Sequence, residues 1–299
     1  MRIVSLVPHA TELLFALGLG EDVVGVTHEC DYPAAAQDLP QVTRDVLEPG
    51  LTPGEIDTAV RARTAAGESI YQLDEELVRE LEPDLIVTQA LCHVCAVSVD
   101  EVQALAQSMP GPPRVIALDP TTYGETVGDV RTVAQATGAR DAALDFIART
   151  ARRADVVRLA VRGAPRPRVA ALEWMDPVFV AGHWTPQLIE MAGGDDVLGF
   201  SGEPSREATW EEVAAARPEV VIVMPCGYDA ARALVEAEEL ADRLRTLGAN
   251  HVVAVNASAY FSRPGPRLVD GLELLAHILH PDRVPQAPAE ALAVQLGRT

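Results

Sequence analysis

The chain has 299 residues, 48% of them apolar and 4% aromatic, which is enough for one large globular domain or two of ordinary size. Its net charge is −20 and all 24 basic residues are arginine, which argues against nucleic acid or an anionic membrane as a direct partner. No apolar run approaches the ~20 residues that span a bilayer, so direct membrane insertion is not expected.

The first half of the chain alternates short apolar strands with helical segments. We predict strands at residues 2–7, 23–27, 85–88 and 114–118, and helices at residues 9–17, 52–66, 74–81, 99–109 and 123–136. Thr52 and Asp74 are expected to be N-caps because their side chains can accept a backbone N–H, and Pro53 suits the first helical position.

A long helix is predicted over residues 140–161, which contain neither Gly nor Pro, and the second half then repeats the alternation. We predict strands at residues 168–174, 178–181, 220–224 and 252–255, and helices at residues 186–192, 210–215, 230–247 and 266–279. The tail after Pro281 is rich in Ala and Pro, and we expect it to be loosely ordered.

This pattern predicts an α/β fold with two lobes, each built on a mostly parallel sheet, joined by one long backbone helix as in a clamshell. We place the first lobe at residues 1–138, the connecting helix at 139–163, the second lobe at 164–286 and a tail at 287–299. The chain opens on a predicted strand rather than on a secretory signal. We therefore expect a cytoplasmic protein, or a periplasmic or extracellular one if a signal peptide has been removed.

All four cysteines follow predicted strands. They are Cys30, Cys92, Cys95 and Cys226. Ligands bind at the carboxyl ends of parallel strands, so we expect these thiols to gather at that edge. Four thiolates can complete a zinc site or hold an iron–sulfur cluster, and the Cys92–Cys95 spacing also fits a redox pair. The alternative is that they are small residues that line a pocket.

Several short segments, in order along the chain, resemble the class III periplasmic binding proteins with a helical backbone. They are residues 5–13 (SLVPHATEL), 16–20 (ALGLG), 24–26 (VGV), 31–33 (DYP), 81–86 (LEPDLI), 191–194 (MAGG), 216–222 (ARPEVVI) and 262–267 (SRPGPR). The resemblance is closest to the vitamin B12-binding branch and extends over residues 2–280. It implies capture of cobalamin or a similar bulky chelate between two lobes, without enzyme activity. The chain departs from the family in its opening residues, in an insertion at residues 47–73 and in its loop Cys and His residues.

Aromatic and histidine side chains at predicted strand ends and loops suit a bulky ligand, because flat rings can wall a corrinoid and a neutral imidazole can bind its metal. The candidate ligand-binding residues are Tyr32, His28, Trp174, His183, Trp184, Tyr228, Tyr260, Phe261 and Arg263, with His93 as a further possible axial contact. The alternatives are ordinary packing and loop hydrogen bonds, and for Arg263 a surface salt bridge.

The resemblance also implies a partner, the permease of an ABC importer, to which one acidic residue on each lobe would dock. Glu211 matches one of these positions, and Glu101, with Asp100 beside it, lies near the other. A solvated surface role is the alternative for both. Two rival functions stay open from the residues alone. The first is a cytoplasmic metal or iron–sulfur protein that uses the four cysteines, and the second is a thiol redox protein built on Cys92 and Cys95.

Overall fold

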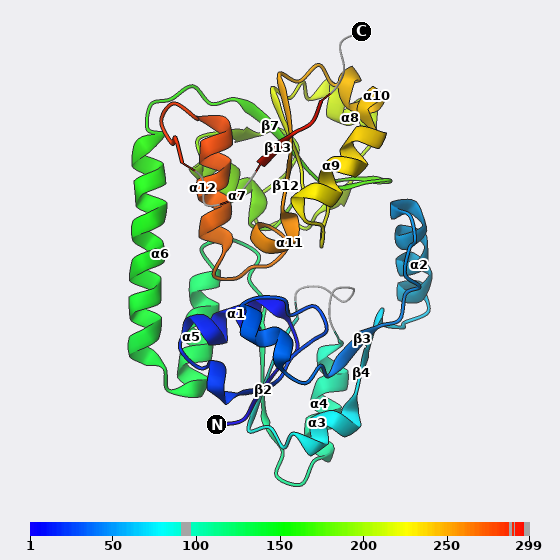
Figure 1. Cartoon of the computed structure of the whole chain (residues 1–299), viewed down its shortest axis with the longest axis vertical. Helices are drawn as coiled ribbons and strands as arrows, with labels where there is room; N and C mark the ends of the chain where they lie inside the picture. Colours follow the sequence, from blue (N-terminus) through cyan, green and yellow to red (C-terminus); the bar gives the residue numbers. More distant parts are fainter. Residues whose placement is uncertain (91–96, 287–288, 290, 296–299) are drawn as a thin grey trace. The chain divides into compact units, whose positions relative to one another are not determined.

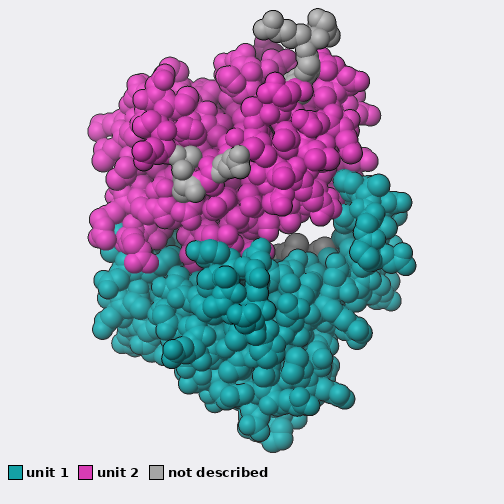
Figure 2. All heavy atoms as spheres, viewed as in Figure 1, with its two compact units in different colours: residues 1–120, 124–148 teal, residues 121–123, 149–299 magenta. Residues whose placement is uncertain are grey.

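The computed structural model describes residues 1–90, 97–286, 289 and 291–295, and its helices and strands are labelled in Figure 1. The chain forms two compact units (Figure 2). Unit 1 contains residues 1–120 and 124–148, and unit 2 contains residues 121–123 and 149–299. Helix α6 (Arg140–Ala160) contributes residues to both units. The predicted fold class, two α/β units connected by one long helix, is confirmed.

Unit 1 is built on a parallel four-stranded sheet in the order β2-β1-β5-β6. Its strands are β1 (Ile3–Ser5), β2 (Val23–Gly25), β5 (Leu85–Gln89) and β6 (Arg114–Leu118). Strands β1 and β5 are buried along their whole length, as expected for a parallel sheet covered on both faces. The predicted insertion contains a helix and ends in β4 (Tyr71–Leu73), which pairs antiparallel with β3 (Thr43–Asp45).

Five α-helices lie wholly within the described part of unit 1, and the second and third of them begin at a side-chain N-cap. The five are α1 (Pro8–Ala16), α2 (Pro53–Ala65), α3 (Glu75–Glu80), α4 (Val99–Ser108) and α5 (Thr126–Thr137), with short 3-10 turns at Gly20–Asp22 and Ala34–Asp38. The predicted N-caps are confirmed, because Thr52 accepts the N–H of Glu55 and Asp74 accepts that of Leu77. The predicted helix at 123–136 begins three residues later than expected, at Thr126.

Unit 2 contains a larger, mixed sheet in the order β10-β8-β7-β11-β12-β13, with β9 also paired to β7. Its strands are β7 (Arg168–Met175), β8 (Val178–Val180), β9 (Asp195–Asp196), β10 (Arg206–Glu207), β11 (Val220–Val223), β12 (His251–Val255) and β13 (Ala291–Ala293). The central strands β7, β11 and β12 are parallel, whereas β8, β10 and β13 run antiparallel to their neighbours. The carboxyl ends of β7, β11 and β12 therefore meet at one edge.

The helices of unit 2 are α7 (Thr185–Met191), α8 (Trp210–Ala215), α9 (Ala230–Glu239), α10 (Ala241–Thr246), α11 (Ala257–Tyr260) and α12 (Leu268–Leu279). The single helix predicted at 230–247 is wrong, because the chain turns at Leu240 between α9 and α10. The helix dipole does not explain this break, because acidic residues at the end of α9 meet its negative end. The turn lets Leu244 and Leu247 pack into the core of the unit.

The expectation of a loosely ordered tail is wrong for residues 291–293. Strand β13 pairs antiparallel with β12, with Leu292 opposite Ala254, and the side chain of Val294 is buried. The Ala-rich sequence has little intrinsic strand preference, so hydrogen bonds to β12 determine its structure. No helix among the described residues is long and apolar enough to cross a membrane.

Candidate functional site

The loops that follow β11 and β12 are hydrogen-bonded to each other and to the end of β7 at the carboxyl edge of unit 2. The N–H of Cys226, after β11, donates to the carbonyl of Glu173 in β7 at 3.0 Å. The N–H of Ser258, after β12, donates to the carbonyl of Tyr228 at 3.0 Å, and the N–H of Gly227 donates to the Ser262 hydroxyl at 3.3 Å. These bonds join the two loops and the end of β7 into one group, which we call the linked loops of unit 2.

An aromatic and cationic stack lies at this edge. The rings of Trp174 and Tyr228 meet edge to face with centroids 5.6 Å apart, and Trp174 Nε1 donates to the carbonyl of Asp176. The guanidinium of Arg232 lies 3.6 Å above the Tyr228 ring, and its Nη2 donates to the Tyr228 hydroxyl at 2.9 Å. Tyr228 is only 5% exposed, so it supports the half-buried Trp174 rather than offering its own surface. The sequence analysis did not single out Arg232 as a candidate residue.

A second aromatic pair connects α7 to the loop after α11. Trp184, which precedes α7, is 6% exposed, and its Nε1 donates to the carbonyl of Phe261 at 2.7 Å. Phe261 is itself 4% exposed. Gly271 in α12 makes room for this loop, because a Cβ there would lie 2.5 Å from the carbonyl oxygen of Tyr260. The structure thus brings the two predicted residues Trp184 and Phe261 together, but both side chains are buried.

His183 adopts a left-handed backbone conformation with φ of +51°, which is strained for a residue with a Cβ. Two backbone hydrogen bonds stabilise this conformation. The N–H of His183 donates to the Glu203 carbonyl at 2.6 Å, and its carbonyl accepts from the N–H of Gly202 at 2.9 Å. The imidazole centroid lies 5.5 Å from that of Trp184. Burial lowers the pKa of His183, so the ring is neutral near pH 7 and can act as a metal ligand.

The remaining candidates of unit 2 lie just before α12. Tyr260 ends α11 and is half-buried, with the guanidinium of Arg267 5.8 Å from its ring centroid. Arg263 is half-buried in the same loop. Guanidinium groups can bond to planar oxygen acceptors, and the role of Arg263 toward a ligand stays a prediction.

In unit 1 the loop after β2 carries the candidate histidine and tyrosine. His28 is half-buried, its Nδ1 lies 2.8 Å from the Thr43 hydroxyl, and its ring centroid is 5.2 Å from that of Tyr71. The Tyr71 hydroxyl donates to Glu29 at 2.9 Å, which joins β4 to this loop. Tyr32 is 49% exposed. The sequence did not single out Tyr71, because it lies 43 positions from His28 in the segment described above as an insertion.

Cys30 lies in the core of unit 1 rather than on an open loop. It is 4% exposed, and its Sγ lies 3.1 Å from both the Thr11 and the Thr27 hydroxyls. Thr11 in turn donates to the buried Ser5 hydroxyl at 2.8 Å. This environment favours the packing alternative for Cys30, since both hydroxyl groups can bond to the thiol without a metal.

The predicted four-cysteine centre lies partly beyond the residues that the structure describes. Cys92 and Cys95, together with His93, fall within residues 91–96, outside the described ranges. Cys226 is exposed in unit 2, whereas Cys30 belongs to unit 1. Among the described residues there is no group of three or more His, Cys, Asp or Glu side chains placed to hold a metal ion.

The two acidic residues predicted to dock a partner lie at helix starts. Glu211 is exposed in the first turn of α8, and Glu101 is exposed in the first turn of α4. Acidic side chains are favoured at these positions by the helix dipole alone. Their exposure is compatible with docking, which stays a prediction.

Glu236 is a buried carboxyl group of α9 that the sequence analysis did not single out. It is 7% exposed, and neither of its side-chain oxygens has a hydrogen-bond partner among the described residues. Burial raises its pKa to about 7, with Arg232 opposing and Glu239 and Asp176 adding to the rise. The available signal was its position between Ala233 and Ala237 on the apolar face of α9.

Comparisons with known proteins agree with this architecture. The family described as periplasmic binding protein matches residues 3–259. The vitamin B12-binding protein of Pectobacterium atrosepticum is 26% identical over 277 residues, covering 90% of this chain and 84% of that protein. The structure is similar to the periplasmic vitamin B12 binding protein of Vibrio cholerae (TM-score 0.67, 22% identity, 93% of this chain and 96% of that chain). It is also similar to a periplasmic heme-binding protein from Roseiflexus (TM-score 0.67, 25% identity, 95% and 98%).

Proposed function

We propose, because the chain belongs to the periplasmic binding protein family, that it captures a corrinoid or a similar bulky metal chelate without converting it chemically. On this proposal the linked loops of unit 2 present Trp174, Tyr260 and Arg263 to the ligand. Tyr32 and His28 of unit 1 stay candidate ligand contacts predicted from the sequence. The relatives named for vitamin B12 support this ligand class over a bare metal ion.

His183 is the observation that carries the proposal. A non-glycine residue in the left-handed region is retained only where the surroundings enforce it, and such positions concentrate at ligand sites. Its neutral imidazole can replace a weak axial ligand on cobalt, and the neighbouring Trp184 limits the orientation of the ring. A metal chelate with one exchangeable axial position fits this arrangement.

Haem is the second candidate, because the same neutral imidazole also suits an iron porphyrin and one similar structure is a heme-binding protein. Both ligands are large, flat and coloured, so a single titration format compares them. The metal-centred rival predicts instead that cysteine substitutions matter most.

The test is a titration of the purified chain with hydroxocobalamin and, separately, with haemin, followed by ultraviolet–visible absorbance. We expect saturable shifts in the corrinoid bands, with His183→Ala and Trp174→Leu raising the Kd about tenfold or more. His251→Ala, which changes an exposed histidine at the start of β12, is the matched control. Binding of haemin alone selects the second candidate. Unchanged binding in both variants contradicts the assigned site.

The rival function, a zinc or iron–sulfur protein, is tested by metal analysis of Cys30→Ser and Cys226→Ser. A cysteine-ligated centre predicts that both variants lose metal, and a cluster also predicts brown absorbance before any titration. A thiol redox protein predicts instead a reversible Cys92–Cys95 disulfide, detected by mass spectrometry after mild oxidation. We expect the cysteine variants to bind hydroxocobalamin as the unchanged chain does.

The proposed partner is the permease of an ABC importer, with Glu211 and Glu101 as docking residues. The name of the matched family and the similar solved structures point to the periplasm, so the cytoplasmic location expected from the opening residues finds no support in them. Charge reversal at Glu211 and Glu101 should leave the ligand titration unchanged and lower ligand uptake by cells. Unchanged uptake would remove the docking assignment.

A further inference from the structure

Unit 2 also has a pocket of about 500 Å³ on the side away from the linked loops. It lies where α6 and α7 end, and it is lined by the turn at residues 161–164 and by Arg158, Arg166, Glu190 and Met191. Arg166 precedes β7, so the pocket is near the amino end of that strand, whereas the linked loops follow the carboxyl ends. Its volume is within the range of small-molecule sites.

The charge of this pocket is opposite to that of the chain. Its lining includes three arginines, Arg158, Arg162 and Arg166, and one acidic residue, in a chain with a net charge of −20. The ion pair of Arg158 with Asp155 is long, at 3.4 Å, and both side chains are about two-thirds exposed (64% and 65%). Such a pair neutralises little charge. For Arg162, no acidic partner is found within the described part of the chain.

Cations often gather at helix ends because the last carbonyl groups carry partial negative charge. At the end of α6 this need is already met by Arg283, whose Nη1 donates to the carbonyls of Ala160 at 3.3 Å and Arg162 at 3.2 Å. The last carbonyl groups of α6 therefore do not need the side chains of Arg158 and Arg162 as hydrogen-bond donors.

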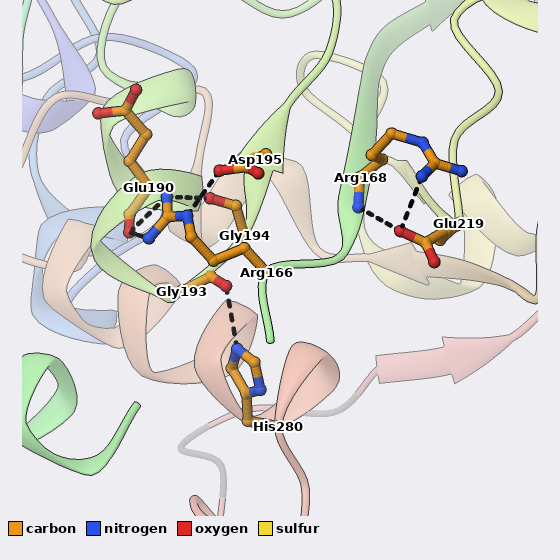
Figure 3. Close-up of polar contacts among 8 residues, drawn as sticks. All are labelled: Arg166, Arg168, Glu190, Gly193, Gly194, Asp195, Glu219 and His280. Carbon is orange, nitrogen blue, oxygen red and sulfur yellow. Dashed lines mark hydrogen bonds and ion pairs between the residues drawn. The ribbon is translucent and has the colours of Figure 1, made fainter. Parts of the chain in front are cut away.

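The end of α7 has its own side-chain partners as well (Figure 3). Arg166 Nε donates to Asp195 at 2.6 Å, and its guanidinium also donates to the carbonyls of Glu190 and Gly194. His280 Nε2 lies 3.1 Å from the carbonyl of Gly193. The Glu190 carboxylate points away from Arg166 in this view, and the ion pair of Arg166 is with Asp195 instead. Arg166 is thus a fixed wall, and Arg158 and Arg162 are the groups available to a ligand.

We propose that this pocket binds a small, multiply charged oxyanion, for which inorganic pyrophosphate is the representative probe. Guanidinium groups bind phosphate oxygens through two parallel N–H donors, and two of them on one wall suit a ligand with two adjacent phosphoryl groups. The site has no aromatic wall and lies away from the linked loops, so it is separate from capture of a chelate.

The test is isothermal titration of the full chain with pyrophosphate at low ionic strength without divalent cations. The double variant Arg158→Gln/Arg162→Gln should weaken binding about tenfold or more, because both forks are lost. The control Arg131→Gln/Arg243→Gln changes the net charge equally at exposed residues of α5 and α10 and should weaken it less than about threefold. Circular dichroism confirms that both variants are folded.

Absence of saturable binding, or an equal loss in the two double variants, would overturn the proposal. Citrate should compete with pyrophosphate, since it also presents several oxyanion groups, whereas chloride at the same ionic strength should not. Equal competition by chloride would reduce the effect to charge screening and also overturn it. Hydroxocobalamin titration of the same variants should be unchanged, so failure of this site and failure of the proposed function are distinguished.

Discussion

Glu236 makes the stability of unit 2 depend on pH in a direction opposite to that of most carboxyl groups. Its carboxyl is buried in α9 without a hydrogen-bond partner among the described residues, and burial raises its pKa from 4.5 to about 7. The unfolded chain therefore releases this proton near pH 4.5, while the folded unit holds it until about pH 7. Between these values folding binds an extra proton, so the free energy of unfolding falls as pH rises.

The magnitude follows from the two pKa values. A rise from 4.5 to about 7 corresponds to about 3 kcal/mol at alkaline pH, of which about 2 kcal/mol is lost between pH 5.5 and 8. Glu236→Gln removes the titrating group with little change of shape. Between pH 5.5 and 8, the free energy of unfolding of the variant should therefore decrease by about 2 kcal/mol less than that of the unchanged chain.

The assay is urea unfolding at several pH values, followed by tryptophan fluorescence. All three tryptophans, Trp174, Trp184 and Trp210, belong to unit 2, so the signal reports this unit. Glu238→Gln, an exposed neighbour on α9, is the control and should follow the unchanged chain. An identical pH slope for Glu236→Gln and the unchanged chain would show that the carboxyl is already ionised in the folded state, which refutes the reasoning.

Three further predictions concern side-chain packing and contacts within each unit. Iodoacetamide should label Cys226 at least about tenfold faster than Cys30 in the native chain, as read by peptide mass spectrometry, and comparable rates would contradict the buried position of Cys30. Arg153→Met should lower the free energy of unfolding by about 1–2 kcal/mol, because Arg153 Nε and Nη2 donate to both carboxylate oxygens of Glu273. That loss should shrink in 1 M salt (about 3 Å screening length), and a salt-independent loss would point to packing instead. Gly271→Ala should cost about 1–3 kcal/mol in urea unfolding, since its Cβ would meet the Tyr260 carbonyl, and an unchanged midpoint would show that the loop moves freely.

Local signals in the sequence were sufficient for the strand–helix alternation. The capping positions Thr52 and Asp74 were correct because each N-cap depends only on the next three residues. Helix α8 and strand β6 were predicted at their observed bounds, since each is a short run with clear flanking residues. Such features depend on nearest neighbours along the chain.

The features that the sequence did not predict depend on contacts between distant segments. Residues 291–293 form β13 only because β12 offers an unpaired edge, and Leu240 interrupts a helix whose composition favours continuation. The pairing of Cys30 with Thr11 needs the packing of α1 on the loop after β2. Burial of Tyr228 beneath Arg232 likewise depends on the position of α9 relative to the end of β11.

The hydrogen bonds within the linked loops affect how this edge of the sheet can evolve. Because Cys226 is hydrogen-bonded to Glu173 and Gly227 to Ser262, a substitution in either loop shifts the energies of substitutions in the other loop and at the end of β7. Single replacements are then a poor guide to combined ones, and a new ligand preference is reached more readily by exchanging the loops together. A recombined set taken from a relative should succeed where its members fail one at a time.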